Sequence, residues 1–579
     1  MRLIKVEVSN YRNIDGITVH LNDECNYLIG ENNIGKSNFL SLLNTICSGK
    51  SFDDSDFSDD TKPIEILLTL KLLQEELGSF DDNFSPDDAS MICIRYIQSV
   101  TEPYPTIIST DTNESIRPGS LKKINFIKYE TTAIPSKELS LNQKKGAGLV
   151  MSSMISRFLD GSDGDLSFLN DEQINRLLLF VNGKLEKIKS FRDYTIKATI
   201  APNPEDMLSG LFYLSDGVSD LPVGSTGSGV QFMAMASISI ISRITELYKS
   251  KSIIFEDLLY SAEDGKKILP LVMSVDEPEV HLHPYLQRSL VAYYKRILKN
   301  EEPEFADLLK FCFGIDGICG QLIVVTHSTD VLVGDYRNLV RFYKNGDRAS
   351  VISGADPELD IRQENEKHLI MHFPDIKEAF YAHCAILIEG ETEYGCIKAF
   401  ADKLGISLDD YGICVINARG ESTINPLRRL LSKFAISSIA VYDGDVKAGR
   451  TPADGEFFTE ELCFEIEIVK NLYNNGRADL VRQIALDRDS NAESVTLDED
   501  FVRKHFRKMG IDLSTYSPQK LSDVSDENEE EFVKLYSAWF MAKKGVLLGR
   551  IIGDVLTPGL IPACYADVIR KAKEVATFE

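Results

Sequence analysis

The chain has 579 residues, of which 43% are hydrophobic and 26% charged, and its formal net charge is −26. This length is too great for one hydrophobic core and predicts about three or four domains. The acidic excess excludes a general nucleic-acid-binding surface, because Lys and Arg contacts to phosphate dominate such binding, so any nucleic-acid contact must be local. With no signal-like or membrane-length apolar run and no CxxC pair among its ten cysteines, we expect a cytosolic, reduced protein without a membrane partner.

The first motif is a phosphate-binding loop. Residues 30–37 read GENNIGKS, which matches GxxxxGK[ST], and they lie between an apolar strand at 27–29 and a helix at 38–43. In such a loop the backbone N–H groups surround a phosphate at a helix N-terminus. Lys36 would contact the β and γ phosphates, and the Ser37 hydroxyl would hold Mg²⁺. The nucleotide-binding residues predicted here are Gly30, Asn33, Gly35, Lys36, Ser37 and Asn38.

The next segment, 146–205, has the periodicity of short amphipathic helices at 148–159 and 172–190. It sustains no heptad repeat, so a long coiled coil is not expected. Residues 224–231 follow as GSTGSGVQ, before an apolar, helix-like run. Taken alone, this second segment is a flexible Gly/Ser loop.

Two apolar strands then end in polar residues. The strand at 271–275 leads into Asp276 and Glu277, the Walker B pattern, in which Asp276 would bind Mg²⁺ and Glu277 would polarise the attacking water. The strand at 322–326 ends at His327, which is predicted to sense the γ-phosphate. The segment up to this histidine therefore carries a complete ATPase motif set.

Two further strands end in acids in the C-terminal third. Residues 385–388 run into Glu389 and Glu393, and residues 439–442 run into Asp443 and Asp445. The carboxyl ends of neighbouring parallel strands meet in one crevice, where open α/β sheets bind ligands. Carboxylate oxygens gathered there suit Mg²⁺ or Mn²⁺. The sequence therefore predicts a second metal and phosphate chemistry in the same chain.

The order of these motifs, GENNIGKS, GSGVQ, DEPEVHLHP, VTHS, IEGETE and DGD, resembles the OLD ("overcoming lysogenization defect") family of nucleases. The resemblance implies an α/β fold: an ABC-type ATPase head similar to RecF and SMC proteins, with a helical insertion, followed by a Toprim α/β domain. The expected parts are 1–145 and 206–375 for the ATPase, 146–205 for a helical insertion or dimerisation element, and 376–579 for the Toprim nuclease. The same motif order is also similar to that of Gabija-type nucleases and of retron-associated OLD-like effectors.

The resemblance also implies an assembly. The Gly/Ser loop resembles the signature loop of ABC-type ATPases, in which Ser228, Gly229 and Gln231 would cap the γ-phosphate bound by a partner subunit. That arrangement requires two heads and therefore implies a homodimer or a larger oligomer.

The Toprim resemblance assigns roles to the acids. Glu389 would be a metal ligand or general base, Glu393 would join the same metal, and Asp443 and Asp445 would complete the coordination of one or two cations. Gly420 would let the backbone approach the site.

Two assignments leave alternatives open. Residues 464–468 alternate like a strand, so Glu465 is either a further metal ligand or one of a solvent-facing pair. Lys544 is either the late lysine that offsets negative charge on the phosphate or a surface lysine.

These features indicate an ATP-regulated endonuclease that nicks or cuts duplex DNA, depends on Mg²⁺ or Mn²⁺ and acts in phage defence. The alternative is a nucleotide-gated sensor or scaffold whose acidic pocket binds a partner, or cleaves RNA rather than DNA. The sign of ATP regulation stays open. The expected partner is a UvrD-like helicase, a retron reverse transcriptase with its small DNA, or none.

Overall fold

The alternating residues near the N-terminus form an antiparallel sheet, which the computed structural model orders as β2-β1-β4-β5-β6. In β4 every second residue is buried, because one face of a sheet packs on a core while the other faces outward. The strands are β1 (Arg2–Ser9), β2 (Ile17–His20), β4 (Ile64–Lys71), β5 (Met91–Gln98) and β6 (Thr106–Ser109).

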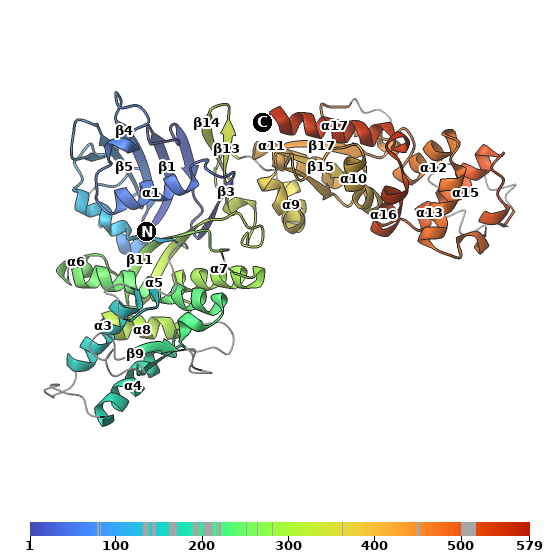
Figure 1. The fold of residues 1–579 in the computed structure, drawn as a ribbon. Helices are drawn as coiled ribbons and strands as arrows, with labels where there is room; N and C mark the ends of the chain where they lie inside the picture. The colour runs from blue at the N-terminus through green and yellow to red at the C-terminus, as the bar shows by residue number, and fades with distance from the viewer. Residues whose placement is uncertain are drawn as a thin grey trace. The chain divides into compact units, whose positions relative to one another are not determined.

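The structure describes residues 1–579 except 78–79, 81–82, 131–137, 142–145, 161–170, 189–195, 201–211, 216, 218–221, 251, 263, 281, 360, 362, 448–451, 499–516 and 579. The chain divides into two units, Met1–Glu358 and Leu359–Glu579 (Figure 1). The division falls ahead of the boundary expected at 375/376. Helix α9 (Gln363–Ile376) belongs to the second unit because it packs on α11 (Glu421–Lys433) of that unit.

A second sheet in the first unit carries the ATPase motifs. Its strand order is β10-β11-β12-β3-β13-β14, with β7 on β11, and the central pairs are parallel. Strands β3, β11 and β12 are buried almost throughout, as continuous apolar runs in a parallel sheet require. The strands are β3 (Cys25–Gly30), β7 (Phe126–Glu130), β10 (Tyr260–Ser261), β11 (Lys267–Asp276), β12 (Gly317–Val325), β13 (Leu339–Asn345) and β14 (Arg348–Ser353).

Helix α1 (Lys36–Cys47) joins the two sheets through a shared core. Its buried residues Phe39, Leu40 and Leu43 belong to the same apolar cluster as Leu68 of β4 and Ile323 of β12. Because the phosphate-binding loop directly precedes α1, this core fixes the loop at the end of β3.

The described residues after β7 form two helices and a hairpin. Helices α3 (Gly146–Asp160) and α4 (Asp171–Leu185) are followed by the hairpin of β8 (Lys197–Ile200) and β9 (Phe212–Ser215). The long helix α5 (Ser228–Ser250) then packs against α3. Helices α7 (Pro284–Leu298) and α8 (Pro303–Phe313) both pack on β12.

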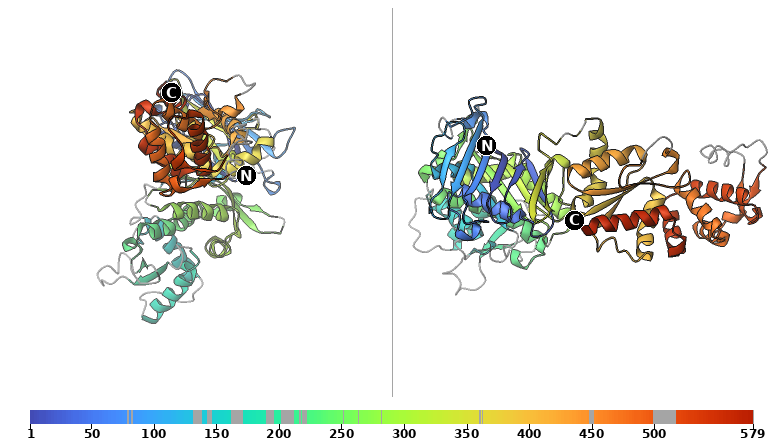
Figure 2. Two further views of the ribbon diagram at one scale, coloured as in Figure 1. Left: turned by 90° about the vertical axis from the view of Figure 1, so that its right-hand side faces the viewer. Right: turned by 90° about the horizontal axis from the view of Figure 1, so that it is seen from above.

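The second unit contains a parallel sheet in the order β16-β15-β17-β18. Its strands are β15 (Cys384–Ile388), β16 (Ile413–Asn417), β17 (Ser437–Tyr442) and β18 (Glu456–Phe458). Helix α10 (Glu391–Lys403) follows β15, α11 follows β16, and α17 (Ala563–Phe578) packs along the strands, as the right-hand view of Figure 2 shows.

Helices α12 (Phe464–Asn474), α13 (Ala478–Arg488), α15 (Glu529–Ala542) and α16 (Val546–Val555) also belong to this unit. They share one core with the sheet, in which the buried Trp539 and Phe540 lie with Ile388 and Val441. Among the described residues, the helices are all too short or too polar to cross a membrane.

Candidate functional site

Two glycines shape the phosphate-binding loop between β3 and α1. Gly30 has φ 125°, and a Cβ there would lie 1.9 Å from the Phe342 carbonyl oxygen. Gly35 has φ 115°, and its Cβ would lie 2.2 Å from a methyl of Ile14. Any side chain at either position would clash in a backbone conformation that favours glycine. The loop therefore keeps the curvature that the motif predicts.

The Lys36 ammonium is held inside this loop. It donates to the carbonyl oxygens of Gly30 at 2.8 Å and Glu31 at 2.5 Å. Burial lowers the pKa of Lys36 to about 8, against the opposing attraction of Glu277 and Asp276. The P-loop lysine and the two Walker B acids are therefore electrostatic neighbours.

The strand order explains why these groups meet. Strand β12 lies between β3 and β11, and Asp276 at the end of β11 pairs in register with Val325 at the end of β12. The Glu277 N–H donates to the Val325 carbonyl at 2.8 Å, and a φ of 52° turns its chain away from the strand. Its carboxylate lies 3.9 Å from His327 Nε2. The carboxyl ends of these parallel strands thus bring together Asp276, Glu277, His327 and Lys36.

Glu279 is a residue of this site that the motif analysis missed. It accepts from the His327 backbone N–H at 2.5 Å and from the Thr326 hydroxyl at 2.9 Å. Burial raises the pKa of the Glu279 carboxyl, which these hydrogen bonds oppose. Glu279 thus stabilises the turn that carries His327. In the sequence it is recognisable only as the second glutamate of DEPE.

Asn38 ties the loop to the N-terminal segment. Its amide donates to Asn13 Oδ1 at 2.7 Å and accepts from the Arg12 guanidinium at 2.7 Å. The Asn33 carbonyl, where φ is 61°, accepts from Asn13 Nδ2 at 3.1 Å. Ser37 lies in the first turn of α1, directly after Lys36.

The Gly/Ser loop ends where helix α5 begins, at Ser228 and Gly229. Gln231 donates from Nε2 to the Thr226 carbonyl at 2.8 Å and so closes this turn. The contact of Ser228 and Gly229 with a nucleotide of a partner subunit stays a prediction, because it involves a second copy.

The second unit has a cavity of about 360 Å³ at the carboxyl ends of β15, β16 and β17. It brings together six of the predicted site residues and several that were not predicted. Its lining residues are Glu389, Gly390, Glu391, Thr392, Glu393, Asn417, Arg419, Gly420, Asp443, Phe464, Glu465, Lys544 and Gly545.

Glu389 and Asp443 are adjacent in the lining of this cavity. The Asp443 N–H lies 3.3 Å from Glu389 Oε2, and Asp443 Oδ1 accepts from the Phe464 N–H at 3.3 Å. The Glu389 carbonyl accepts from the Gly420 N–H at 3.0 Å. Gly420 has φ 131°, a conformation that is essentially restricted to glycine, so the turn into α11 can reach Glu389.

Glu393 also lines the cavity and is buried, with 3% of its surface exposed. Its two oxygens accept from the Gly390 N–H at 2.6 Å and from the Tyr565 hydroxyl at 2.9 Å. Burial raises the pKa of Glu393 well above its usual range, and the negative charges of Asp443 and Glu465 raise it further. These bonds make Glu393 a support for the turn that carries Glu389. Its predicted role as a metal ligand stays a prediction.

The prediction of a strand at 464–468 is wrong, because these residues form the beginning of helix α12. Both glutamates lie in its first turn, where acidic side chains are favoured by the helix dipole, and a five-residue alternation is too short to specify a strand. On the helix the two side chains diverge. Glu465 lines the cavity and accepts from the Thr392 hydroxyl at 2.8 Å, whereas Glu467 accepts from the Glu461 N–H at 2.8 Å.

The two lysines before α16 have different positions. Lys544 lines the cavity, while Lys543 makes an ion pair with Asp489 at 3.0 Å. This arrangement favours Lys544 as the lysine that would face a phosphate. Asp445 is exposed on the short 3-10 helix Gly444–Val446 and is not among the cavity-lining residues.

Arg419 is a cavity residue that the motif analysis missed. It lies directly before Gly420 with φ 55°, and its guanidinium contacts Asp375 of α9 at 3.2 Å. Its positive φ and its position after the parallel strand β16 identify Arg419 as a site residue only once the fold is known. Arg419 and Lys544 supply cationic side chains at the cavity.

The donors of this cavity suit a divalent cation of the Mg²⁺ or Mn²⁺ type. Glu389, Asp443 and Glu465 offer carboxylate oxygens, the ligand class that these cations prefer. In the part of the chain that the structure describes, no three acidic, histidine or cysteine side chains are yet close enough to hold a metal ion. The fit therefore rests on the chemistry of the donors that share the cavity.

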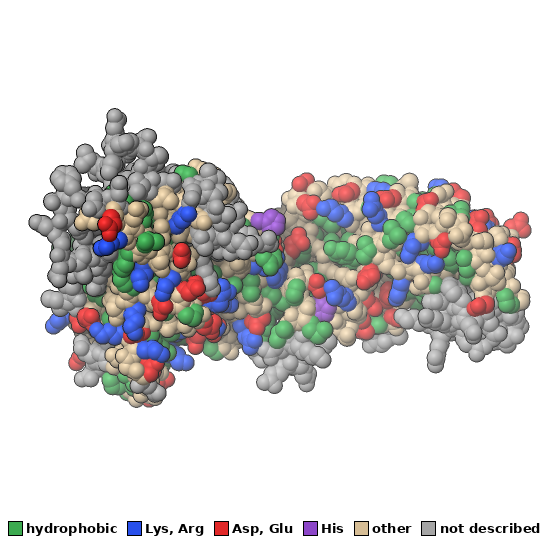
Figure 3. Space-filling model, turned by 90° about the horizontal axis from the view of Figure 1, so that it is seen from below, with side chains coloured by type: hydrophobic (Ala, Val, Ile, Leu, Met, Phe, Trp, Pro, Cys, Tyr) green, Lys and Arg blue, Asp and Glu red, His purple; other side chains and the backbone are tan. Residues whose placement is uncertain are grey.

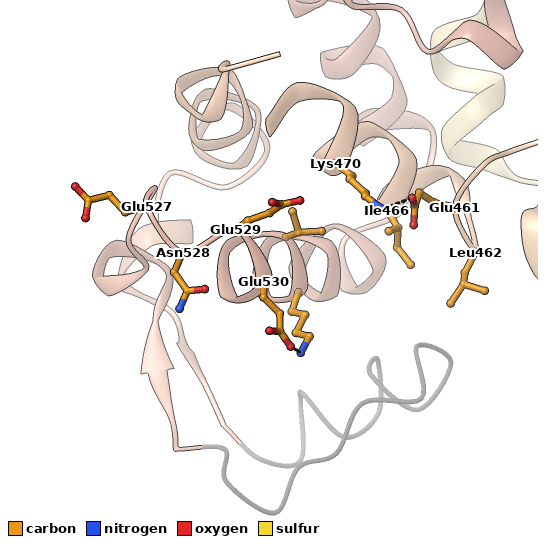
Figure 4. A pocket seen from close by; sticks show the side chains of 10 residues that line it. Glu461, Leu462, Ile466, Lys470, Glu527, Asn528, Glu529 and Glu530 are labelled. Carbon is orange, nitrogen blue, oxygen red and sulfur yellow. Dashed lines mark hydrogen bonds and ion pairs between the residues drawn. The ribbon is translucent and has the colours of Figure 1, made fainter. Parts of the chain in front are cut away.

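A larger cavity, of about 700 Å³, lies between α12 and α15 (Figure 4). Glu461, Glu527, Glu529 and Glu530 line it together with Lys470 and Lys534. Lys470 pairs with Glu461 at 2.5 Å, and Lys534 pairs with Glu530. Two carboxylates remain in excess, so this cavity is unsuited to phosphate, and it lies away from the strand ends that carry the acidic motifs.

The family profiles match both units. The profile described as "Overcoming lysogenization defect protein-like, TOPRIM domain" matches residues 380–445, and the AAA ATPase domain profile matches residues 1–194 and 163–332. The chain belongs to the OLD family. The expected fold, an ATPase head followed by a Toprim domain, is confirmed, and the Toprim match covers the acidic strand ends after β15 and β17.

Relatives of this OLD protein include two nucleases. The Old nuclease of Escherichia phage P2 is 23% identical over 490 residues, which are 77% of each chain. The endonuclease GajA of Bacillus cereus (strain VD045) is 35% identical over 82 residues, 13% of this chain and 14% of GajA. The solved C-terminal region of the Burkholderia pseudomallei OLD protein is 17% identical and covers 34% of this chain and 98% of its own, with a TM-score of 0.23.

Proposed function

We propose that this OLD protein is an ATP-regulated, divalent-metal-dependent DNA endonuclease. One observation carries the proposal: Glu389, Asp443, Glu465 and Lys544 line a single cavity at the carboxyl ends of parallel strands. Carboxylates and a lysine together suit hydrolysis of a phosphodiester, because the acids can hold cations and the ammonium can face the anionic phosphate. The similarity to the two nucleases supports this reaction class.

The residues of the cavity have different roles in the proposed reaction. A bound Mg²⁺ or Mn²⁺ supplies a Lewis acid and a water of lowered pKa. Glu389, Asp443 and Glu465 would hold the cation, and Lys544 would offset the negative charge that develops on the phosphate oxygens. Arg419 adds a second cationic contact for the substrate backbone.

The charge distribution supports local rather than general contact with DNA. Acidic and basic side chains are interspersed on the face of the molecule in Figure 3. Arg419 and Lys544 stand at the cavity itself. Substrate would therefore be attracted at the site of reaction, while the net charge of −26 opposes general binding of DNA.

A plasmid assay tests the proposed activity. The full-length protein is incubated with supercoiled DNA and Mg²⁺ or Mn²⁺, and open-circular and linear products are measured. Metal-dependent cleavage of DNA is expected, with EDTA stopping it. Cleavage of RNA alone, or no cleavage with either metal at any ATP concentration, would contradict the proposal.

The proposed ATPase cycle includes a dimer that closes through the Gly/Ser loops. In Glu277→Gln, hydrolysis is expected to slow by about a hundredfold or more, because the side chain that activates water loses its basicity. ATP binding is retained, so the ATP-bound dimer accumulates. Hydrolysis assays and light scattering after gel filtration with ATP measure both effects. An ATP-loaded variant that stays monomeric at high protein concentration would overturn the dimer proposal.

The pKa of Lys36 gives ATP binding a defined pH dependence. Phosphate binding favours the charged ammonium, and the pKa of about 8 in the free protein lies below the usual 10.5. Above pH 8 the free protein must take up a proton to bind ATP, so affinity is expected to fall by up to about tenfold per pH unit. Below pH 8 this lysine contributes no pH dependence.

Isothermal titration at pH 7 and pH 9 checks this expectation. Lys36→Arg is the control, since its guanidinium stays charged across that range and should bind with little change in affinity between the two pH values. Equal affinities of the wild-type protein at both values would refute a lowered Lys36 pKa.

We also propose a role in phage defence, as the resemblance of the motifs to the OLD family implies. A helicase or reverse transcriptase as partner, and a cytosolic location, stay predictions from the sequence.

A further inference from the structure

Thr392 lies in the first turn of α10 and is buried, with 3% of its surface exposed. Its hydroxyl takes part in two hydrogen bonds. It donates to Glu465 Oε1 at 2.8 Å and accepts from the Gly545 N–H at 3.0 Å. A single buried oxygen therefore links three segments that are far apart in sequence.

The first link reaches a candidate metal ligand. Glu465 is buried in the first turn of α12, with 7% exposed, and its carboxylate lines the cavity. A buried carboxylate requires hydrogen-bond donors, and the Thr392 hydroxyl is one of them. Because one carboxylate oxygen is held, the orientation of the group toward the cavity is restricted.

The second link reaches the candidate phosphate-facing lysine. Gly545 follows Lys544 directly and has φ 136°, a conformation that disfavours other residues. Close packing of α16 on α10 fixes the same turn. A Cβ on Gly549 would lie 1.9 Å from the Thr392 carbonyl oxygen, and one on Gly395 would lie 2.3 Å from the Val546 carbonyl oxygen. Lys544 thus enters the cavity from a turn anchored to Thr392.

We propose that Thr392 is a positioning residue that sets Glu465 and Lys544 relative to each other in the cavity. The proposal rests on the proposed nuclease function and deepens it. The Thr392 hydroxyl is engaged by Glu465 and by the Gly545 N–H, so Thr392 acts through the carboxylate of α12 and the turn before α16. Hydrogen bonds of this kind to metal-ligating carboxylates orient the ligand, and their loss typically costs about 10- to 100-fold in metal affinity or activity.

The test compares Thr392→Val, which has nearly the same shape without the hydroxyl, with Thr392→Ser, which keeps it. Thr423→Val is the matched control, because Thr423 is a buried threonine in the first turn of α11 and lies outside the cavity lining. Mn²⁺ binding to the full-length protein without nucleotide is measured by titration and by electron paramagnetic resonance. Cleavage is measured separately at saturating Mn²⁺.

For T392V we expect Mn²⁺ affinity to fall by about 10- to 100-fold and cleavage at saturating Mn²⁺ to stay about tenfold or more below wild type, because Lys544 is displaced as well. T392S should stay within about threefold of wild type, and T423V should match it. In a Glu465→Gln background the Thr392→Val substitution should have little further effect on Mn²⁺ affinity, since coupled residues are not additive.

Wild-type Mn²⁺ affinity and cleavage in T392V would overturn the proposal, as would full additivity with E465Q. If T392V does not fold, Thr392→Cys takes its place, because the thiol is a weak donor of similar size. A wild-type protein that binds Mn²⁺ but cleaves nothing would refute the nuclease function. A lower Mn²⁺ affinity of T392V would still support the positioning role in that case.

Discussion

Glu389→Gln and Asp443→Asn are expected to lower metal-dependent cleavage by on the order of a thousandfold or more. Each substitution removes a carboxylate charge from the cavity lining, where the Asp443 backbone nitrogen and Glu389 Oε2 lie 3.3 Å apart. A metal-stabilised transition state is worth several kcal/mol, and about 4 kcal/mol corresponds to that factor. Rates of plasmid nicking under single-turnover conditions measure the effect.

Asp402→Asn serves as the control, because Asp402 is exposed on the same helix α10 and lies outside the cavity lining. Its rate should equal that of the wild type, and the thermal midpoints of all variants should show that the fold is kept. Wild-type cleavage by both cavity variants would place the reaction elsewhere. Asp445→Asn belongs in the same series, since its exposure predicts a smaller loss than at Asp443 if the cavity alone holds the metal.

Lys36→Ala is expected to remove ATP hydrolysis, by at least about a hundredfold, and to weaken ATP binding. The ammonium is the cation that the loop presents to the β and γ phosphates, and loss of one such preorganised donor costs about 10² to 10³ in rate. Hydrolysis is followed by phosphate release, and binding by titration calorimetry. Lys50→Ala is the control, an exposed lysine shortly after the end of α1.

The same variant decides the sign of ATP regulation. Cleavage by K36A and by the wild type is compared from zero to millimolar ATP. If ATP restrains the nuclease, K36A cleaves at high ATP as the wild type does without ATP; if ATP activates it, K36A stays inactive throughout. Identical ATP responses of the two proteins would mean that the P-loop does not control the nuclease.

Local sequence was sufficient for the motif-bearing elements. The phosphate loop lies between β3 and α1, and Asp276 ends β11. Glu389 and Asp443 directly follow β15 and β17. These assignments depend on neighbours within a few residues, and continuous apolar runs of strand length that end in turn residues are typical of parallel sheets.

The secondary structure of residues 464–468 was predicted wrongly for a related reason. An alternation over five residues is compatible with a strand. In the structure these residues begin helix α12, which buries Phe464, Ile468 and Leu472 on one side. Packing of that helix against the Toprim core overrides the local pattern. Glu465 was a candidate metal ligand on the assumption of a strand. It is the first turn of helix α12 that places Glu465 in the cavity.

The sequence by itself determined the family, the order of the two domains, and the loop and strand ends on which Lys36, Asp276, Glu389 and Asp443 stand. Only the tertiary structure decided which further side chains meet them. Glu279 holds the His327 turn, Tyr565 holds Glu393, and Thr392 joins Glu465 to the turn after Lys544. The Tyr565–Glu393 pair spans 172 residues, and the Thr392 bonds span 73 and 153. Such contacts are set by how helices pack on the sheet, and no local spacing encodes them.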